Sequence, residues 1–222
     1  MFDEEPGTTN ITKIEEEKDL GIIFDQTLKF SIHVAKCASR ANNIVGIIKR
    51  TFTQLDKDMF LTLYKTMVRP IMEYGSCVWR PWLKKDINIL ERVQRRATKL
   101  IHEIKNISYK ERLLKLGLPT LEYRRQRYDM IQVFKILNNL DVVENSESLL
   151  ELVTVTKTRG HNMELKKKYC KSERRKNSFF FRIVDPWNNL PDEVVSAESV
   201  NIFKSRLNTH WKHDPHKFNH IF

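Results

Sequence analysis

Two groups of side chains in this sequence have the chemistry of metal ligands. One is a set of carboxylates near the start of the chain: Glu15, Glu16, Glu17, Asp19 and Asp25. The other is a set of imidazoles near its end: His210, His213, His216 and His220. Imidazole favours transition metals, but Pro215 interrupts any helix that would bring the rings together. An acidic run at a chain start is more typical of a solvated surface, so the sequence predicts no metal site.

Residues for nucleophilic or cofactor-dependent catalysis do not form a known motif. The sequence contains no Walker-type phosphate loop, no GxGxxG, no HExxH and no GxSxG. Cys37, Cys77 and Cys170 are odd in number and widely spaced, which argues against a disulfide framework and a CxxC motif. We expect Cys37 and Cys77 to be small buried residues. No cofactor is predicted for this chain.

The distribution of charge says more than the motifs do. The 222 residues carry 39 Lys and Arg against 28 Asp and Glu, a formal net charge of +11. Residues 84–127 hold thirteen bases and five acids, and residues 157–182 hold ten bases and two acids, so each block has a surplus of eight. Two such blocks favour an anionic partner, of which nucleic acid is the commonest large one. The alternative is that they are solvated helix faces and a flexible loop.

Hydrophobic periodicity predicts the elements that position these charges. Leu20–Phe24 is expected as one short buried strand. Apolar residues then recur at three- and four-residue spacing, which is typical of amphipathic helices. We predict helices that begin near the following residues: Ser31, Asp56, Asp86, Ser108, Pro119 and Ser199. Ser31, Asp56 and Ser199 are expected to be N-cap residues. Pro70 is expected to end or kink the second of these, with Arg69 outside helical geometry. Residues 154–177 have little periodicity and are expected to be irregular.

The most regular predicted helix runs from Asp86 to Ile104. Its apolar residues make one face, and its bases lie mostly away from that face. Ser108 and Glu111 have the spacing of a capping box for the next helix, which Gly117 ends. A rigid helix that presents bases outward suits a phosphate backbone better than a loose tail does.

Five stretches resemble a known family in its own order. They are KDLGIIFDQTLKFSIHV (18–34), LYKTMVRPIMEYGSCVW (63–79), ILERVQRRATKLI (89–101), SYKERLLKLGLPTLEYRRQRYDMIQVFKIL (108–137) and TRGHNMELKKKYCKSERRKNSFFFRIVDPWNNLPDEVVSAESVNIFKSRL (158–207). Together they resemble the region that follows the palm in non-LTR, LINE-type retrotransposon reverse transcriptases. Within that family they look most similar to the CR1 and jockey groups. Reverse transcriptases are RNA-directed DNA polymerases.

The resemblance also implies what this chain lacks. The family's palm holds two Mg²⁺ ions with an aromatic-x-Asp-Asp motif and an earlier Asp, and no such motif occurs here. The chain therefore looks like the last palm strand, the thumb and the C-terminal extension of a truncated polymerase that has no catalytic residues, with Mg²⁺ expected only for the missing palm. We predict that the chain alone is not an enzyme.

A thumb grips a template–primer duplex, so the resemblance implies that the basic helices face nucleic acid. The RNA, DNA or hybrid nature of that duplex stays open. We predict phosphate contacts by six residues: Arg92, Arg95, Arg96, Lys99, Arg124 and Arg125. Such contacts position a backbone and do not read its sequence. The alternative is a non-catalytic helical protein-interaction module, or an inert remnant, that associates through apolar surface left exposed without a palm.

The predicted fold is mainly α, with one N-terminal strand, a helical thumb-like bundle, and a partly irregular basic region that ends in a helix. Its expected segments are an acidic start (1–18), the strand and thumb-like domain (19–140), an acidic connector (141–156), the basic C-terminal region (157–211) and a His-rich tail (212–222). No apolar run is long enough to cross a membrane, and no secretory signal is visible. The expected location is intracellular, in the nucleus or the cytoplasm.

Overall fold

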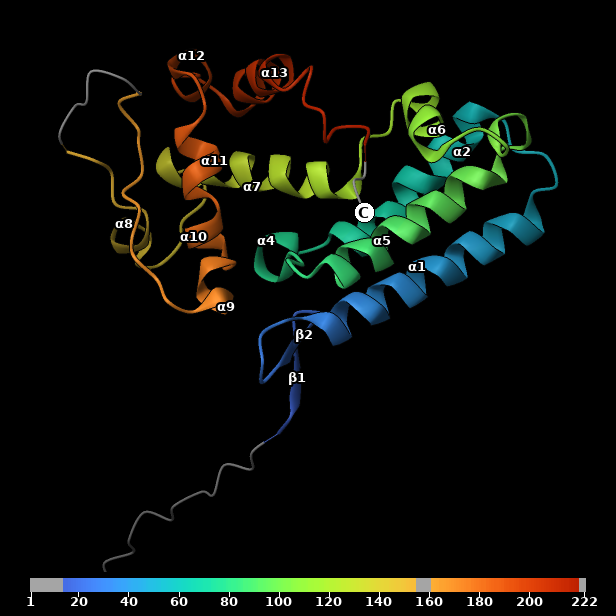
Figure 1. Cartoon of the computed structure of the whole chain (residues 1–222), viewed down its shortest axis with the longest axis horizontal. Coiled ribbons are helices and arrows are strands. Elements are labelled where there is room, and N and C mark those ends of the chain that lie inside the picture. Colours follow the sequence, from blue (N-terminus) through green and yellow to red (C-terminus); the bar gives the residue numbers. More distant parts are fainter. Residues whose placement is uncertain (1–13, 155–160, 220–222) are drawn as a thin grey trace, which may run out of the picture.

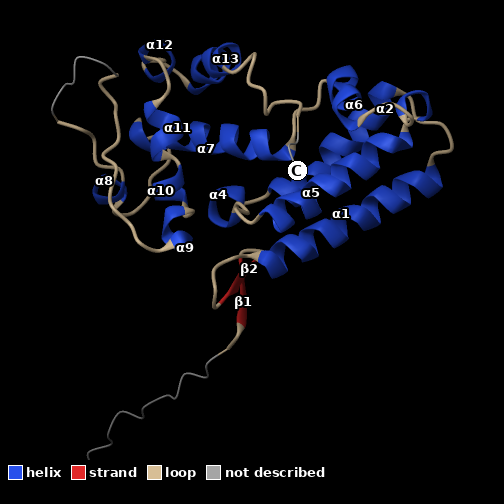
Figure 2. Cartoon of the chain, in the orientation of Figure 1, coloured by secondary structure: helices blue, strands red, loops and turns tan. Residues whose placement is uncertain are grey.

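A computed structural model describes residues 14–154 and 161–219 of the chain, and it shows a mainly α fold as predicted (Figures 1 and 2). Most of the predicted acidic start (1–13), the junction of the predicted connector and basic region (155–160) and residues 220–222, with His220, lie outside the described residues. Among the helices it describes, none is long and apolar enough to cross a membrane.

The described part of the chain begins with a hairpin, where a single strand was expected. Strand β1 (Glu16–Asp19) pairs antiparallel with β2 (Ile22–Asp25), and Glu16 lies opposite Asp25. Ile22 and Ile23 of β2 are buried, whereas all four residues of β1 are exposed. The prediction missed β1 because a fully exposed polar strand has no apolar alternation to mark it.

Helices α1 (Ser31–Thr51) and α5 (Lys84–Ala97) pack side by side and form the longest contact of the N-terminal half (Figure 1). The stripe that α1 buries is the predicted one, and it includes Val34, Ala41 and Val45. Ser31 does not cap α1, contrary to the prediction. The Ser31 hydroxyl instead donates to Asp86 Oδ2 at 2.6 Å, which joins the first turns of α1 and α5.

The second predicted helix continues past Pro70. Helix α2 (Lys57–Leu63), capped by Asp56 as predicted, passes into a π-helical turn, η1 (Tyr64–Val68), and then into α3 (Arg69–Glu73). Arg69 is helical, with φ −62° and ψ −41°, so the prediction for it was wrong. A proline ring clashes with the carbonyl group four residues earlier in a regular helix, and the wider π turn lies where that clash would occur.

A tight corner follows α3. Gly75 precedes α4 (Ser76–Trp79) at φ +63°, a conformation that favours glycine. A Cβ atom on Gly75 would lie 2.8 Å from Ile22 Cδ1 of β2. The corner thus brings the hairpin directly against α4.

The helix predicted from Asp86 to Ile104 is shorter and begins earlier. Helix α5 ends at Ala97, and two 3-10 turns follow, η2 (Thr98–Leu100) and η3 (His102–Ile104). Helix α6 (Tyr109–Leu116) has the predicted capping box of Ser108 and Glu111 and ends at Gly117 with φ +63°. Thr120 caps the long helix α7 (Leu121–Leu137).

The C-terminal half is built from short helices around the second half of α7 (Figure 1). They are α8 (Ser146–Leu149), α9 (Glu173–Lys176), α10 (Phe179–Arg182), α11 (Val184–Asn188), α12 (Asp192–Val195) and α13 (Val200–His210). Ser199 caps α13 as predicted. The segment between α8 and α9 is largely irregular where it is described, apart from a bridge between Leu152 and Leu165.

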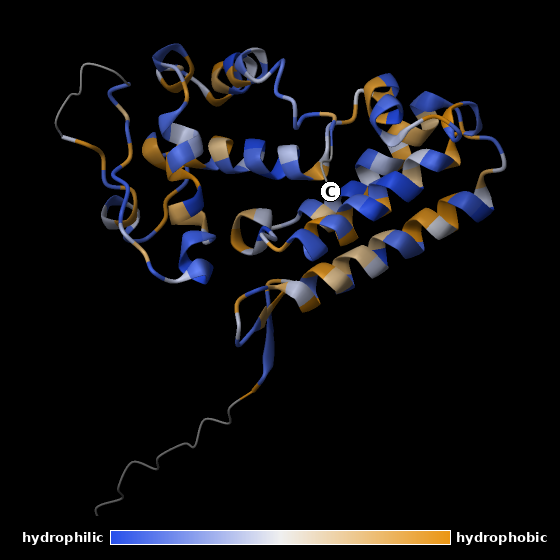
Figure 3. Cartoon of the chain, viewed as in Figure 1, coloured by the Kyte–Doolittle hydropathy of each residue, from blue (hydrophilic) through white to orange (hydrophobic). Residues whose placement is uncertain are grey.

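Buried apolar side chains form two clusters, and α7 contributes to both. The first core lies among α1, α2, α5 and α6 and includes Leu121 at the start of α7. The second core collects Met130, Val133 and Phe134 of α7 with residues of α11 to α13. The buried residues of α7 accordingly lie on more than one side of the helix, and Figure 3 shows hydrophobic and hydrophilic residues mixed along it. The predicted basic C-terminal region therefore packs directly on the last helix of the predicted thumb-like domain.

Buried charges connect the two halves. The Asp129 carboxylate of α7 accepts from Arg80 Nη1 at 2.8 Å and from Arg182 Nε and Nη2, each at 3.0 Å. Arg182 Nη2 also donates to the Cys77 carbonyl oxygen at 2.7 Å. A carboxylate between two guanidinium groups thus ties α4 and α10 to α7.

Candidate nucleic-acid interface

The exposed face of α5 carries a row of three basic side chains, Arg92, Arg96 and Lys99, which we call the α5 basic row. They follow one another at spacings of four and three residues, so they lie on one side of the helix and of the turn η2 that extends it. The opposite side of α5 is buried through Ile87, Leu90 and Val93. The sequence predicted this division, and the structure has it.

The α5 basic row is free of acidic partners within the described part of the chain. None of its three residues forms an ion pair with another described residue. Arg96 Nη1 donates to Asn42 Oδ1 of α1 at 3.3 Å, which directs this side chain along the α1–α5 contact. A solvated basic side chain without a carboxylate partner is available to an external anion.

Arg95 is half-buried, although the prediction grouped it with its neighbours. Its guanidinium carbon lies 4.8 Å from the ring centre of Tyr109 on α6. Arg112 approaches the same ring at 5.5 Å. Part of the Arg95 side chain therefore packs between α5 and α6 and is not available to an external ligand.

Arg124 is paired inside the protein. Its Nη2 donates to Glu73 Oε2 at 2.8 Å and its Nε donates to Glu73 Oε1 at 2.5 Å. This fork-shaped pair joins α7 to the end of α3. Arg124 was expected on a face toward nucleic acid, but its donors already hold a carboxylate.

Arg125 departs furthest from its expected place. Its side chain is 1% exposed, so a phosphate outside the protein does not reach it, and the expectation of a surface contact was wrong. None of its guanidinium nitrogens has a hydrogen-bond partner among the described residues. Burial lowers the pKa of Arg125 to about 10, which still leaves the group charged at neutral pH, and the Glu91 carboxyl opposes this lowering more than any other charged group does.

A buried polar cluster under α5 fixes the orientation of the basic row. Glu91 is 1% exposed and accepts from the Tyr109 hydroxyl at 2.5 Å and from the Leu121 backbone N–H at 3.0 Å. Gln94 Nε2 donates to the Tyr109 hydroxyl oxygen at 3.0 Å, and the Tyr64 hydroxyl donates to Gln94 Oε1. Burial raises the pKa of the Glu91 carboxyl. These bonds lock α5 against η1, α6 and α7.

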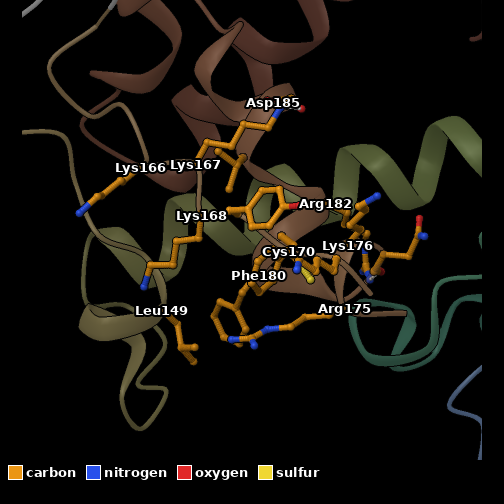
Figure 4. Close-up of a pocket in the computed structure, with 15 residues that line it drawn as sticks. Leu149, Lys166, Lys167, Lys168, Cys170, Arg175, Lys176, Phe180, Arg182 and Asp185 are labelled. Carbon is orange, nitrogen blue, oxygen red and sulfur yellow. Dashed lines mark hydrogen bonds and ion pairs between the residues drawn. The ribbon is translucent and has the colours of Figure 1, made fainter. Parts of the chain in front are cut away.

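The second basic block contains a cavity that the sequence did not reveal. It has a volume of about 860 Å³ and lies between residues 166–171 and α9 to α11 (Figure 4). Lysines, arginines and aromatic residues line it together. The composition of residues 157–182 marked this block as basic, but a hollow within an irregular segment leaves no periodic trace in the sequence.

The described residues hold no group of three His, Cys, Asp or Glu side chains that could bind a metal ion. Asp25, a member of the acidic cluster, accepts from the backbone N–H groups of Thr27 at 2.8 Å and Phe30 at 2.9 Å and so shapes the turn after β2. In the His-rich tail, the His216 carbonyl oxygen accepts from the Thr120 hydroxyl at 3.0 Å, so part of the tail lies against the start of α7.

Two of the cysteine thiols, those of Cys37 and Cys77, have raised pKa values that make them poorly reactive. Burial raises the pKa of Cys37, which contacts His33 Nε2 at 3.3 Å. Burial also raises the pKa of Cys77, and the nearby Asp129 carboxylate raises it further. Both thiols stay protonated at neutral pH, and a protonated thiol is a poor nucleophile.

Comparison with known proteins gives one distant relative. No protein-family model and no solved structure matches the chain. The uncharacterized protein B0403.1 of Caenorhabditis elegans is 24% identical over 125 residues, which are 55% of this chain and 61% of that protein. The match therefore spans about three-fifths of the relative's own length.

Proposed function

We propose that this chain binds the phosphate backbone of a nucleic-acid duplex through the α5 basic row, and that it does not itself synthesise DNA. The observation that carries the proposal is the row itself: three exposed bases on one side of a rigid helix, with no ion pair to a described residue. The resemblance to the thumb region of LINE-type reverse transcriptases supports it. In this proposal the chain derives from such a polymerase and lacks the palm.

The geometry favours a backbone ligand over a base-reading one. Arg92 and Lys99 are seven residues apart, about 10 Å along a helix, so the row follows a short stretch of phosphates. Charged contacts of this kind supply affinity and register without sequence preference. We therefore expect similar affinity for duplexes of equal length and different sequence.

Salt dependence tests the proposal directly. Three phosphate contacts give a slope of about −3 for log affinity against log salt, shallower than six contacts would give, because Arg124 and Arg125 are occupied or buried and Arg95 is half-buried. Fluorescence anisotropy with a labelled 20-base-pair duplex, at about 50 to 200 mM salt, measures this slope. Replacing Arg92, Arg96 and Lys99 together with Gln should bring it close to zero.

A charge-matched control separates the row from net charge. The triple variant Lys105→Gln, Lys110→Gln and Lys115→Gln removes three exposed bases from α6 and the segment before it. It should retain most of the affinity and the slope. Equal losses in both triple variants, or a flat salt response of the unaltered chain, would contradict the proposal.

Exposed apolar side chains favour a second candidate function, association with another protein. Leu20 is 80% exposed and Tyr74 is 62% exposed, and the two flank Gly21, where an added Cβ would lie 3.7 Å from the Tyr74 ring. Size-exclusion chromatography over a wide range of concentrations tests association. A monomer at all concentrations that binds duplex would exclude self-association through this surface and leave the first candidate standing.

A further inference from the structure

We propose that the cavity between residues 166–171 and α9 to α11 binds a short stretch of single-stranded nucleic acid, with phosphates at Lys171 and Arg175 and a base stacked on Tyr169. This inference rests on the proposed binding of nucleic acid but places a different strand form at a separate site. The 860 Å³ volume lies within the range of pockets that enclose small organic ligands.

The charge of the cavity is the first argument for this ligand. Seven basic side chains line it: Lys166, Lys167, Lys168, Lys171, Arg175, Lys176 and Arg182. Four carboxylates pair with them, those of Glu151, Asp185, Glu173 and Asp129. A surplus of three positive charges remains, and of the carboxylates only that of Asp185 belongs to the lining. An anion of several charges fits this balance.

Two of the seven bases remain without a carboxylate partner in the described structure. Lys171 is exposed and forms no ion pair there. Arg175 lies with its guanidinium carbon 5.0 Å from the ring centre of Phe181, a contact that orients the side chain and leaves its charge uncompensated. In Figure 4, Arg175 and Asp185 lie at opposite ends of the group of labelled lining residues.

The aromatic lining is the second argument, and it favours a nucleotide over a simple phosphate as the ligand. Tyr169, Phe180 and Phe181 line the same cavity as the bases. Tyr169 is 85% exposed, although aromatic rings usually bury a large part of their surface. An exposed aromatic ring that lines the same cavity as basic side chains without carboxylate partners is the combination with which proteins hold unpaired nucleobases and their phosphate backbone. A duplex hides its base faces, so Tyr169 favours a single strand.

The test compares two probes on the full chain. A labelled ten-nucleotide oligothymidine and a labelled 20-base-pair duplex are titrated by fluorescence anisotropy. Tyr169→Ala should weaken binding of the oligothymidine roughly five- to hundredfold, the range for loss of one base–aromatic stack, and should leave duplex binding unchanged. Arg175→Gln should also weaken it and flatten its salt dependence. Tyr74→Ala, which removes another exposed tyrosine far from the cavity in sequence, is the matched control and should change neither affinity.

The binding results distinguish a separate single-strand site from the alternatives. Unchanged oligothymidine binding in Tyr169→Ala overturns the inference, and so does an equal loss for Tyr74→Ala. If Tyr169→Ala and the triple variant of the α5 basic row each weaken both probes alike, there is one composite surface and no separate single-strand site. If the duplex does not bind but the oligothymidine binds and depends on Tyr169, the proposed function of α5 fails while the cavity inference stands.

Discussion

Asp129 accepts hydrogen bonds from Arg80 and Arg182 where the two halves meet, and its side chain is 1% exposed. Asp129→Ala leaves two largely buried guanidinium groups without their carboxylate. Breaking a buried ion pair from one side typically costs about 3–5 kcal/mol of the free energy of unfolding. Urea denaturation followed by circular dichroism measures the loss.

The ion pair between Lys167 and Asp185 is the matched comparison. Its side chains are 70% and 65% exposed, so water already solvates both charges. Asp185→Ala should lower the free energy of unfolding by no more than about 1 kcal/mol. Similar losses in Asp129→Ala and Asp185→Ala would show that burial of the Asp129 cluster contributes nothing.

Glu91 makes the stability depend on pH. Because burial raises the pKa of its carboxyl, the native state binds a proton more readily than the unfolded chain does. Stability is then lost as the pH rises from the unfolded pKa through the native one. Relative to the unaltered chain, Glu91→Gln should therefore become more stable as the pH rises from about 4 to about 7. Denaturation at several pH values measures this difference.

Glu111 gives the opposite sign and serves as the control. The Ser108 side chain and backbone hold the pKa of this exposed carboxyl below its usual value, so the bonds stabilise the fold when Glu111 is ionised. Glu111→Gln should become relatively less stable over the same rise in pH. A difference that is independent of pH for both variants would contradict these assignments.

The sequence predicts whether a basic side chain is exposed only where its own helix decides the matter. Arg92, Arg96 and Lys99 are exposed because their own helix turns them away from its apolar face. Arg124 and Arg125 occupy a helix with similar spacing, but Glu73 holds one, and the packing of other elements around α7 buries the other. Periodicity predicts the face of a helix on which a side chain lies. Whether another part of the protein covers or pairs with that side chain depends on residues about fifty positions away, such as Glu73 for Arg124.

At the scale of the element, the hairpin turn stores avoidable strain. Leu20 and Gly21 connect β1 to β2 with φ values of 45° and 85°, and two positive φ angles in a two-residue loop favour Asn-Gly. Leu20 is 80% exposed and gives up little burial when replaced. Leu20→Asn should raise the free energy of unfolding by roughly 0.5–1 kcal/mol and slow hydrogen exchange in β2.

Leu20→Ala distinguishes the turn from the side chain. Alanine removes the exposed leucine but keeps the cost of a left-handed backbone. It should bring no gain in urea denaturation. An equal gain in both variants would mean that the exposed side chain, and not the turn conformation, limits stability.

Elements with local signals were predicted well. The capping box of Ser108 and Glu111, the stop at Gly117 and the cap at Ser199 each lie within four residues of the helix end that they determine. The helix does not end at Pro70, because the chain widens into the π turn η1 and continues, an adjustment supported by the burial of Tyr64 and Val68. The local rule predicts that a proline disfavours a regular helix. Tertiary packing decides whether a π turn can form and let the helix continue.

At the scale of the molecule, the sharing of α7 predicts that both cores unfold together. Trp79 is fully buried in the first core and Trp187 in the second. Two variants, each with the other three tryptophans replaced by Phe, report one core at a time by fluorescence. In each variant, the fluorescence transition of the remaining tryptophan should have the same urea midpoint as the circular-dichroism transition of the whole chain, because α7 and the Asp129 cluster are lost to both cores at once.

Asp129→Ala in the same two backgrounds weakens the connection between the cores. The fluorescence and circular-dichroism midpoints should then separate, with the second core unfolding first, since its helices α10, α11 and α12 are only four or five residues long. Distinct fluorescence and circular-dichroism midpoints in a variant that keeps Asp129 would show that α7 does not couple the cores.

The shared helix also sets an order in time during synthesis. Phe134 stacks on Phe203 with ring centres 4.4 Å apart, but Phe203 follows it by 69 residues. At a translation rate of about 5–20 residues per second, the ribosome needs roughly 3 to 14 seconds to synthesise the residues up to Phe203. All buried residues of the first core, up to Leu121, are synthesised before Phe203, and Met130, Val133 and Phe134 are without their partners until it arrives. During those seconds chaperones and neighbouring nascent chains compete with the chain's own C-terminus for this strip.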